Sequence, residues 1–294
     1  MAATSHIVSM TMPTQSVLAG ARRLLSKVET EGKDAPHIWR FVGAGEVLTA
    51  GGRICFAAAD GMRQRVGDLL RHQRNPPLPR RFMTEAVARC RREEIPLGEA
   101  LLATEQIRPD GLRAALMEQT TEAIARLGSA RVEGTVVTPL AQVPHDGSFC
   151  FAPAEILAHL GARADMAAAV VAKKTLREML ADTGGWGAAC LAADLAGERV
   201  PVAVERSVPV ATMVEGLGWA SEALTAARAA GVSFVREPSG GKARVAWTDR
   251  GLIFTGLVEL ATMESLDGRF GSAKNRPNTP SKSNAVASRP SIHA

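Results

Sequence analysis

The segment RVGDLL at residues 65–70 returns in altered form as PLGEAL at residues 96–101, and this repeat organises the first half of the chain. Both copies share the pattern apolar, glycine, acid, any residue, leucine, and a second stretch with helical spacing follows each, at residues 82–92 and 112–119. Because glycine has no Cβ, Gly67 and Gly98 would allow helices to approach closely. The pattern predicts a helix–loop–helix unit present twice. Its expected core contains Leu97, Leu101, Ile107, Leu112 and Leu116.

Short β-prone runs lie before the repeat, at residues 39–41, 46–48 and 53–58, and glycines separate them. They predict a hairpin or small meander, with an amphipathic helix ahead of it at 17–28. After the repeat, residues 132–140 and 148–151 are strand-like around a turn at 144–147. A short helix at 154–160 is expected to end at Gly161.

The second half alternates helical and strand-like segments. Helices are expected at 166–180 and 212–230, and strands at 188–193, 200–204, 232–236, 243–247 and 252–258. The predicted fold class is therefore α+β: an N-terminal β-hairpin plus helical repeat domain, then a small antiparallel sheet covered by helices. The expected organisation is a disordered leader (1–15), a first domain (16–161), a second domain (165–270) and a disordered basic tail (271–294).

Composition narrows the class of protein. The chain has 294 residues, a net charge of +5 and a pI near 9.3, but residues 271–294 supply four of those charges, so nucleic-acid binding is not expected of the folded part. No apolar run is long enough to span a membrane, and the first residues lack the features of a signal peptide. The cytoplasm is the expected compartment.

The four cysteines are too few for a disulfide scaffold, and each is expected to be a small buried thiol.

The second copy of the repeat, LGEALLATEQIRPDGLRAALMEQ (97–119), resembles the N-terminal module of type II secretion and pilus ATPases. With GGRICFAAAD (51–60) before it and DGSFCFAP (146–153) after it, the region from about 38 to 160 resembles the PATAN-type domain of bacterial regulators. That resemblance implies a regulatory domain in which a glycine-turned strand pair leads into helical units.

A cyclic di-GMP sensor is the alternative function that this resemblance raises. Some secretion-ATPase modules bind the dinucleotide through tandem motifs that open with arginine and carry a second glycine. By that resemblance the candidate residues are Arg65, Gly67, Gly98 and Gln119. The second copy departs from the motif, with Pro96 in place of the arginine and Glu105 in place of the glycine, so the dinucleotide interpretation is disfavoured.

The C-terminal half resembles the roadblock fold, from GWGAACLAADLAGERVPVAVERS (185–207) through GKARVAWTDRGLIFTGLVE (241–259). In that fold two strands pair across a turn, a helix crosses the sheet, and three strands return. The resemblance implies a non-enzymatic module that dimerises or binds a small GTPase.

Motifs that suggest catalysis have simpler interpretations. Asp182-Thr183-Gly184 matches the tripeptide of aspartic proteases but follows a predicted helix, so it is expected to end that helix. Gly240-Gly241-Lys242 lacks the spacing of a phosphate loop and is expected to be a turn. The six histidines are dispersed, so no metal site is expected. No catalytic residue and no cofactor are predicted.

These observations predict a non-catalytic bacterial signalling or regulatory adaptor that acts through protein–protein interaction. The partner is expected to be a bacterial regulator or a small GTPase, with a possible homodimer through the C-terminal domain and no membrane association. Arg71, Arg89 and Arg92 belong to a basic stretch on the first repeat, which is either a docking patch or a solvated face. Trp219 is the fourth candidate partner contact, and core packing is its alternative role.

Overall fold

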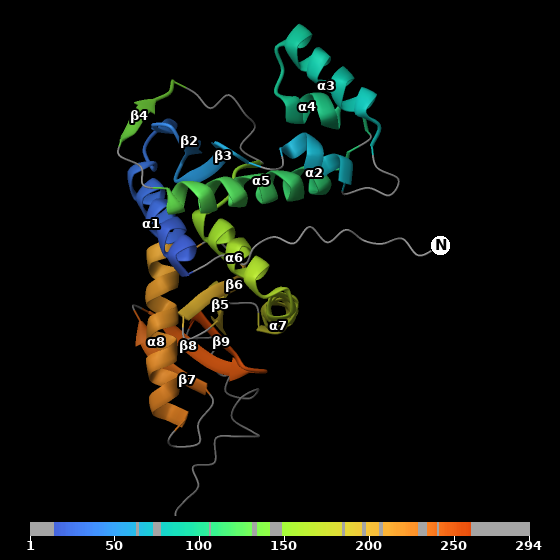
Figure 1. The fold of residues 1–294 in the computed structure, drawn as a ribbon. Coiled ribbons are helices and arrows are strands. Elements are labelled where there is room, and N and C mark those ends of the chain that lie inside the picture. Colours follow the sequence, from blue (N-terminus) through green and yellow to red (C-terminus); the bar gives the residue numbers. More distant parts are fainter. Residues whose placement is uncertain are drawn as a thin grey trace, which may run out of the picture.

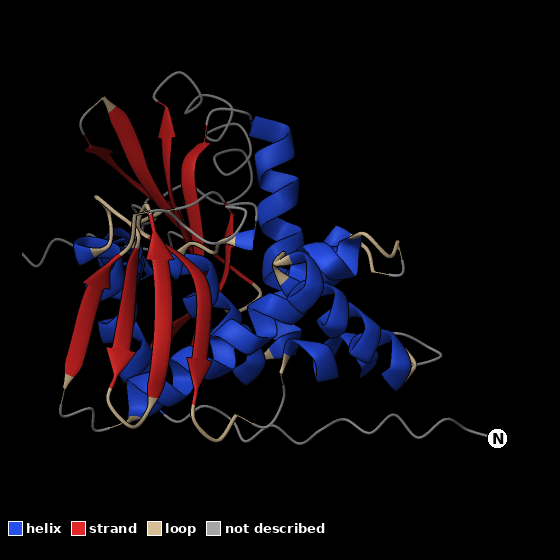
Figure 2. Cartoon of the chain, turned by 90° about the horizontal axis from the view of Figure 1, so that it is seen from above, coloured by secondary structure: helices blue, strands red, loops and turns tan. Residues whose placement is uncertain are grey.

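The computed structural model describes residues 15–62, 65–72, 78–105, 107–130, 134–141, 149–183, 186–195, 198–205, 208–228, 234–239 and 241–259. The leader predicted at 1–15, apart from its last residue, and the tail predicted at 271–294 lie outside these ranges. The fold is α+β, as predicted, with two antiparallel sheets that share no strand (Figure 1; Figure 2).

The first sheet is the predicted meander with a fourth strand added. Strands β1 (His37–Phe41), β2 (Gly45–Ala50) and β3 (Arg53–Ala59) follow one another, and β4 (Thr135–Pro139) gives the order β3-β2-β1-β4. Gly51 and Gly52 adopt φ of +56° and +70° at the β2–β3 turn, a backbone conformation that favours glycine. The turn expected at 144–147 lies outside the described residues, and the described parts of the two segments beside it have separate partners. Strand β4 pairs with β1, whereas Phe151 bridges to Ile54 of β3.

Three helices complete the first core. Helices α1 (Gln15–Glu31), α5 (Pro109–Ser129) and α6 (Pro153–Ala164) pack with the sheet around the fully buried Trp39, Phe151 and Ile156. Helices α1 and α5 meet at Gly20 and Gly128, where a Cβ on either residue would overlap the backbone of the other helix. The pair of glycines therefore sets how closely these two helices pack.

The repeat forms the predicted helix–loop–helix units in sequence order, α2 (Val66–His72) then α3 (Arg80–Glu93), and α4 (Leu97–Leu102) then α5, but α2 packs mainly on α5 and α3 mainly on α4. A Cβ at Gly67 would lie 3.0 Å from Cε of Met83, and one at Gly98 would lie 3.3 Å from Cδ2 of Leu112. Each glycine thus faces the second helix of its own unit, as the pattern predicts. The expected core side chains Leu101, Ile107 and Leu112 are buried, and Leu97 and Leu116 pack against them.

The second sheet has five strands between two helices. Its elements are α7 (Met166–Thr183), β5 (Trp186–Leu195), β6 (Glu198–Glu205), α8 (Val210–Arg228), β7 (Phe234–Ser239), β8 (Lys242–Asp249) and β9 (Leu252–Glu259), in the strand order β6-β5-β9-β8-β7. Buried side chains of α7 pack on one face with Val245 and Phe254, and those of α8 pack on the other face with Ala246. The predicted antiparallel sheet covered by helices is therefore present.

The two halves share one hydrophobic core. Helix α6 packs on β6 as well as on α1, and the first core continues through Val200 to Val210, Met213 and Leu217 of α8. The prediction that a helix ends at Gly161 is wrong: Gly161 lies inside α6, and a Cβ there would overlap the carbonyl oxygen of Pro201 in β6. This glycine is required by a close approach between helix and strand rather than by a helix end.

The expectation that all four cysteines are separate buried thiols is wrong for two of them. Cys55 and Cys150 form a disulfide rather than two separate buried thiols, with their Cα atoms 4.0 Å apart. They are adjacent because Ile54 and Phe151, the residues beside them, form an antiparallel bridge. Cys90 is a free thiol, and the side chain of Cys190 lies outside the described residues. Because the two cysteines are 95 residues apart in the sequence, their spacing could not predict that they pair.

In the described ranges no helix is both long enough and apolar enough to cross a membrane.

Candidate functional site

A large cleft lies where the end of β3 meets α2 and α3. Its volume is about 730 Å³, within the range of small-molecule sites in proteins. Its apolar wall comes from Phe56, Met62, Met83, Val87 and Leu97. Its charged lining residues are Asp60, Arg65, Asp68, Arg71 and Arg80. The cleft therefore combines apolar surface with three arginines from two consecutive helical segments.

In the part of the chain that the structure describes, the three arginines have no paired carboxylate. Arg65 and Arg80 are exposed, Arg71 is half-buried, and among the described residues none of these guanidinium groups forms a salt bridge. Arg71 instead donates from Nε to the carbonyl oxygen of Leu78 at 3.4 Å. Asp68 accepts a hydrogen bond from the backbone N–H of Arg65 at 3.4 Å. The arginine side chains are thus available to an anionic group that enters the cleft.

Gln119 fixes the floor of this cleft. Its Oε1 accepts a hydrogen bond from the backbone N–H of Val66 at 2.7 Å, and its Nε2 donates to the carbonyl oxygen of Ala57 at 3.4 Å. One buried side chain on α5 thereby joins the first turn of α2 to β3. Because Oε1 and Nε2 each form one of these hydrogen bonds, Gln119 acts as a structural link between α2 and β3.

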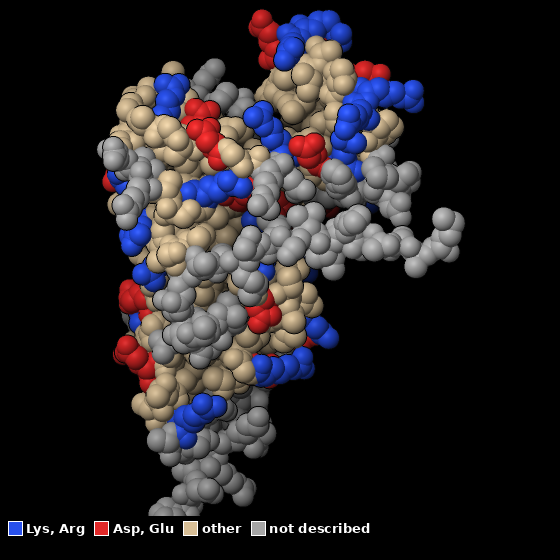
Figure 3. Space-filling view, viewed as in Figure 1, with Lys and Arg blue, Asp and Glu red and all other residues tan. Residues whose placement is uncertain are grey.

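A second groove continues from the first. It has a volume of about 620 Å³ and shares Ala58, Ala59, Asp60 and Arg65 with the cleft. It runs to the β1–β2 turn and β4, where Val42 is 69% exposed and Val136 is 54% exposed. In Figure 3, basic side chains lie on both sides of the hollow between the four-stranded sheet and α3. We call the cleft and this groove together the arginine trough.

The predicted site residues are partly brought together. Of the four dinucleotide candidates, Arg65, Gly67 and Gln119 line the cleft, whereas Gly98 faces Leu112 and does not line it. Of the partner candidates, Arg71 lines the same cleft. Arg80, which belongs to the same basic stretch, and Met83, which the sequence did not indicate, join them. Their nearness to Arg65 depends on tertiary packing, in which α3 packs on α4 and Met83 reaches Gly67 of α2.

Arg89 and Arg92 lie at the far end of α3 and are paired. Glu93 accepts from Arg89 Nε at 2.8 Å and from Arg92 Nη2 at 3.0 Å. Hydrogen bonds from Arg89 and then Arg92 lower the pKa of Glu93. This end of the basic stretch is therefore a solvated, charge-paired helix end, one of the two roles considered from the sequence.

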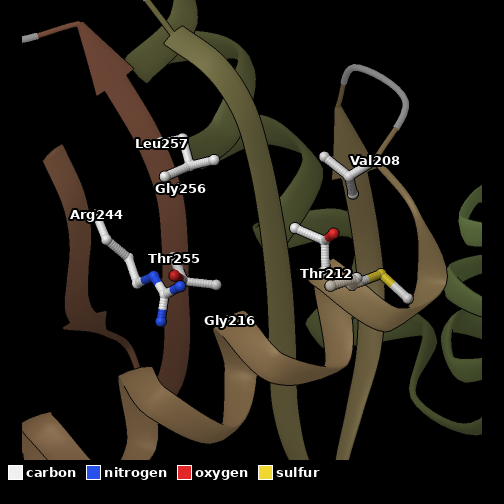
Figure 4. Close-up of a pocket in the computed structure, with 8 residues that line it drawn as sticks. Val208, Thr212, Gly216, Arg244, Thr255, Gly256 and Leu257 are labelled. Atoms are coloured by element: carbon white, nitrogen blue, oxygen red, sulfur yellow. The ribbon is translucent and has the colours of Figure 1, made fainter. Parts of the chain in front are cut away.

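Trp219 lies far from the cleft, on α8 against the second sheet. It is half-buried, and the guanidinium of Arg244 lies 5.3 Å from its ring centroid. Arg244 also pairs with Glu215 at 3.0 Å. Figure 4 shows a small cavity beside this cluster, with Arg244 and Thr255 facing Gly216. Its volume of about 50 Å³ suits ordered water rather than a cofactor.

The groups that resembled catalytic motifs occupy structural positions. Asp182 lies in the last turn of α7, and Gly241 adopts φ of +82° between the paired strands β7 and β8. His159 contacts Glu118 at 2.8 Å across the α5–α6 interface. In the part of the chain that the structure describes, no cluster of three histidine, cysteine or acidic side chains could hold a metal ion.

No protein-family model matches this chain, and no curated protein sequence is significantly similar to it.

Proposed function

We propose that this protein is a non-catalytic bacterial regulatory adaptor of the cytoplasm that binds a protein partner through the repeat helices and dimerises through its C-terminal half. The observation that carries the proposal is the arginine trough, where Arg65, Arg71 and Arg80 lie without salt-bridge partners among the described residues, beside an apolar wall. A surface of this kind is suited to recognition, because its charges are free to pair with a partner's charges.

The order of elements supports both parts of the proposal. A glycine-turned meander followed by two helix pairs agrees with the organisation expected from the PATAN resemblance. In the second half, β5 pairs with β6, α8 connects β6 to β7, and β8 and β9 follow, which is the order of elements expected from the roadblock resemblance. That resemblance is the reason to propose a dimer, and to keep a small GTPase or a bacterial regulator as the partner.

Partner capture with the intact chain tests the adaptor function. Because α6 packs on β6 and the halves share one core, the domains cannot be tested as separate fragments. The full-length protein, cross-linked in its native cells and isolated, is expected to retain a protein partner. Light scattering of the purified chain is expected to give twice the 31.0 kDa monomer mass. A monomer without a cross-linked partner would contradict the proposal.

A cyclic di-GMP sensor is a second candidate, favoured by one observation. Arg65 and Gly67 line a single cleft of about 730 Å³, so an anionic nucleotide has both a cation and the necessary volume. Calorimetry with cyclic di-GMP tests this candidate directly. Heat of binding at micromolar protein that disappears in Arg65→Ala would support the sensor, and the absence of heat would exclude it.

A further inference from the structure

We propose that the arginine trough binds an acidic peptide segment of the partner, held by carboxylates on Arg65 and Arg80 and by an apolar side chain in the cleft. The inference rests on the proposed adaptor function and names the chemistry of its partner. It follows from three features of the trough: its length, its charge and its apolar wall.

The length of the trough favours a chain over a compact ligand. Its two parts, of about 730 and 620 Å³, share Arg65 and three neighbouring residues of the β3 end, so they form one continuous depression. Each part alone falls within the range of about 300–1,000 Å³ that is usual for a small-molecule site, whereas the two parts together exceed it. An extended peptide advances about 3.3 Å per residue, so a few residues can follow the trough from α3 to the β1–β2 turn.

The charge of the trough sets the sign of the ligand. Arg65 lies in the shared part, with Arg80 and Arg71 on the α2–α3 side and Arg40 on the β1 side. Three acidic residues, Asp60, Asp68 and Glu46, also line the trough, so the four arginines leave it with a net positive charge. Arg40 is partly neutralised by Glu46 at 3.9 Å, whereas Arg65 and Arg80 form no salt bridge among the described residues. Carboxylates on a peptide can form bidentate hydrogen bonds with both guanidinium groups. A basic peptide would instead bring like charges together.

The apolar wall provides the anchor. Met83 and Val87 lie one helical turn apart on α3 and remain half-buried, next to Phe56 of β3. Thioether and aliphatic side chains adapt to a partner's leucine or methionine. Val42 and Val136 extend apolar surface at the other end, where both are exposed. An acidic segment with at least one large apolar residue therefore matches the trough in both respects.

Selection from a peptide library tests the proposal without knowledge of the natural partner. Random peptides of about 12 residues displayed on phage are selected on the full-length protein at about 0.15 M salt, where the Debye length is about 8 Å. The expected result is enrichment of peptides rich in Asp and Glu that carry Leu, Met or Phe. Fluorescence anisotropy with one enriched, labelled peptide then measures affinity.

Two neighbouring arginines provide matched variants. Arg80 lines the cleft, whereas Arg81, the next residue of the same helix turn, is exposed and does not. We expect Arg80→Glu and Arg65→Glu each to weaken peptide binding by about tenfold or more, and Arg81→Glu to weaken it by less than about twofold. Val87→Thr, which conserves shape and removes apolar surface, should weaken binding several-fold. Thermal unfolding of each variant verifies that it is folded.

Several results would overturn the proposal: no enrichment, enrichment of neutral or basic peptides, or equal effects of Arg80→Glu and Arg81→Glu. Binding of cyclic di-GMP that is lost in Arg65→Glu, with no enriched peptide, would assign the cleft to a small anion instead. A different result would refute the adaptor function itself: no protein partner cross-linked to the wild type in its native cells. A cross-linked native partner that Arg80→Glu still retains would preserve the adaptor and refute the trough as its binding site.

Discussion

The carboxylate of Glu29 in α1 accepts a hydrogen bond from the backbone N–H of Val210, the first residue of α8, at 2.7 Å. The two residues are 181 positions apart, and the contact joins the end of one helix to the start of another (Figure 1). A carboxylate at this place satisfies one of the N–H groups that a helix leaves unpaired in its first turn. Glu29 therefore ties the N-terminal half of the molecule to the C-terminal half.

Removal of this cap should destabilise the whole protein. We expect Glu29→Ala to lower the free energy of unfolding by about 1 kcal/mol, because the N–H of Val210 loses its acceptor. Glu29→Gln, which keeps an oxygen acceptor, should remain close to the wild type at neutral pH. Urea unfolding measures both variants, and equal stability of the alanine and glutamine variants would contradict the role of the cap.

The same residue predicts a pH dependence. Burial raises the pKa of Glu29, and the hydrogen bond from Val210 and the charge of Lys33 only partly oppose the shift. The folded protein therefore holds this proton more tightly than the unfolded chain. The resulting stabilisation is fully present below the ordinary glutamate pKa, about 4.3, and is lost as pH rises through the raised folded value. Glu29→Gln should lack this component when unfolding free energies are compared across acidic pH.

The α1–α5 crossing should not tolerate a methyl group. Gly128→Ala would place Cβ against the backbone of Gly20 and Ala21, so we expect a loss of roughly 3 kcal/mol in unfolding free energy. Gly111, near the start of the same helix α5, has open space around its Cβ position. Gly111→Ala should therefore be neutral or should stabilise by up to about 1 kcal/mol. Similar unfolding midpoints for the two variants would refute the close packing.

The α5–α6 interface depends on an ionised glutamate. Burial alone would raise the pKa of Glu118, but the hydrogen bond from His159 and the charge of Arg163 outweigh it and lower the pKa to about 2. The stability that this carboxylate contributes is present above the ordinary glutamate pKa and is lost as pH falls toward 2. Glu118→Gln should cost about 3 kcal/mol at neutral pH, because it leaves the nearly buried Arg163 unpaired.

Glu178→Gln provides the comparison for Glu118. Its carboxylate pairs with Lys174 at 3.8 Å on the exposed surface of α7, so its loss should cost less than about 0.5 kcal/mol. Chemical denaturation at neutral and acidic pH measures both. A cost at Glu118 no larger than that at Glu178 would contradict the structural role of the α5–α6 pair.

The Cys55–Cys150 disulfide should stabilise the wall of the cleft. It closes a long loop and joins β3 to the segment before α6, where Arg53 also donates to the carbonyl oxygen of Cys150 at 2.8 Å. Cys55→Ala should lower the unfolding free energy by about 2–4 kcal/mol under non-reducing conditions. A thiol reductant should lower the wild type similarly and leave Cys55→Ala unchanged. Cys90→Ala should keep the sensitivity to reductant, and insensitivity of the wild type would refute the pairing.

Most elements of the fold could be predicted from periodicity, and most relationships between distant elements could not. The repeat glycines predicted the contacts of Gly67 with Met83 and of Gly98 with Leu112, which lie within one unit, but not the packing of α2 on α5 and of α3 on α4. The pairing of β4 with β1, the disulfide and the contact of Glu29 with Val210 join positions about a hundred or more residues apart. Gly161 was misassigned because a helix end and a tight helix–strand contact both favour glycine.

The residues of the candidate site also differ in whether the sequence alone could identify them. Arg65, Gly67 and Arg71 were recognisable because they belong to one short segment around the first repeat. Arg80 and Met83 enter the cleft through tertiary packing, in which α3 packs on α4 and Met83 reaches Gly67 of α2. Gln119, a candidate from the resemblance, reaches the cleft from α5. A basic stretch alone could not separate Arg71, in the cleft, from Arg89 and Arg92, which Glu93 neutralises.

Partner capture by matched variants tests the central claim most directly. The full-length wild type, the double variant Arg65→Glu/Arg80→Glu and the control Arg81→Glu are each cross-linked in the native cells, isolated and compared by quantitative mass spectrometry. We predict that one partner protein is retained by the wild type and by Arg81→Glu and is depleted about tenfold or more by the double variant. Retention of the same proteins in equal amounts by all three would contradict the claim that the arginine trough is the binding surface.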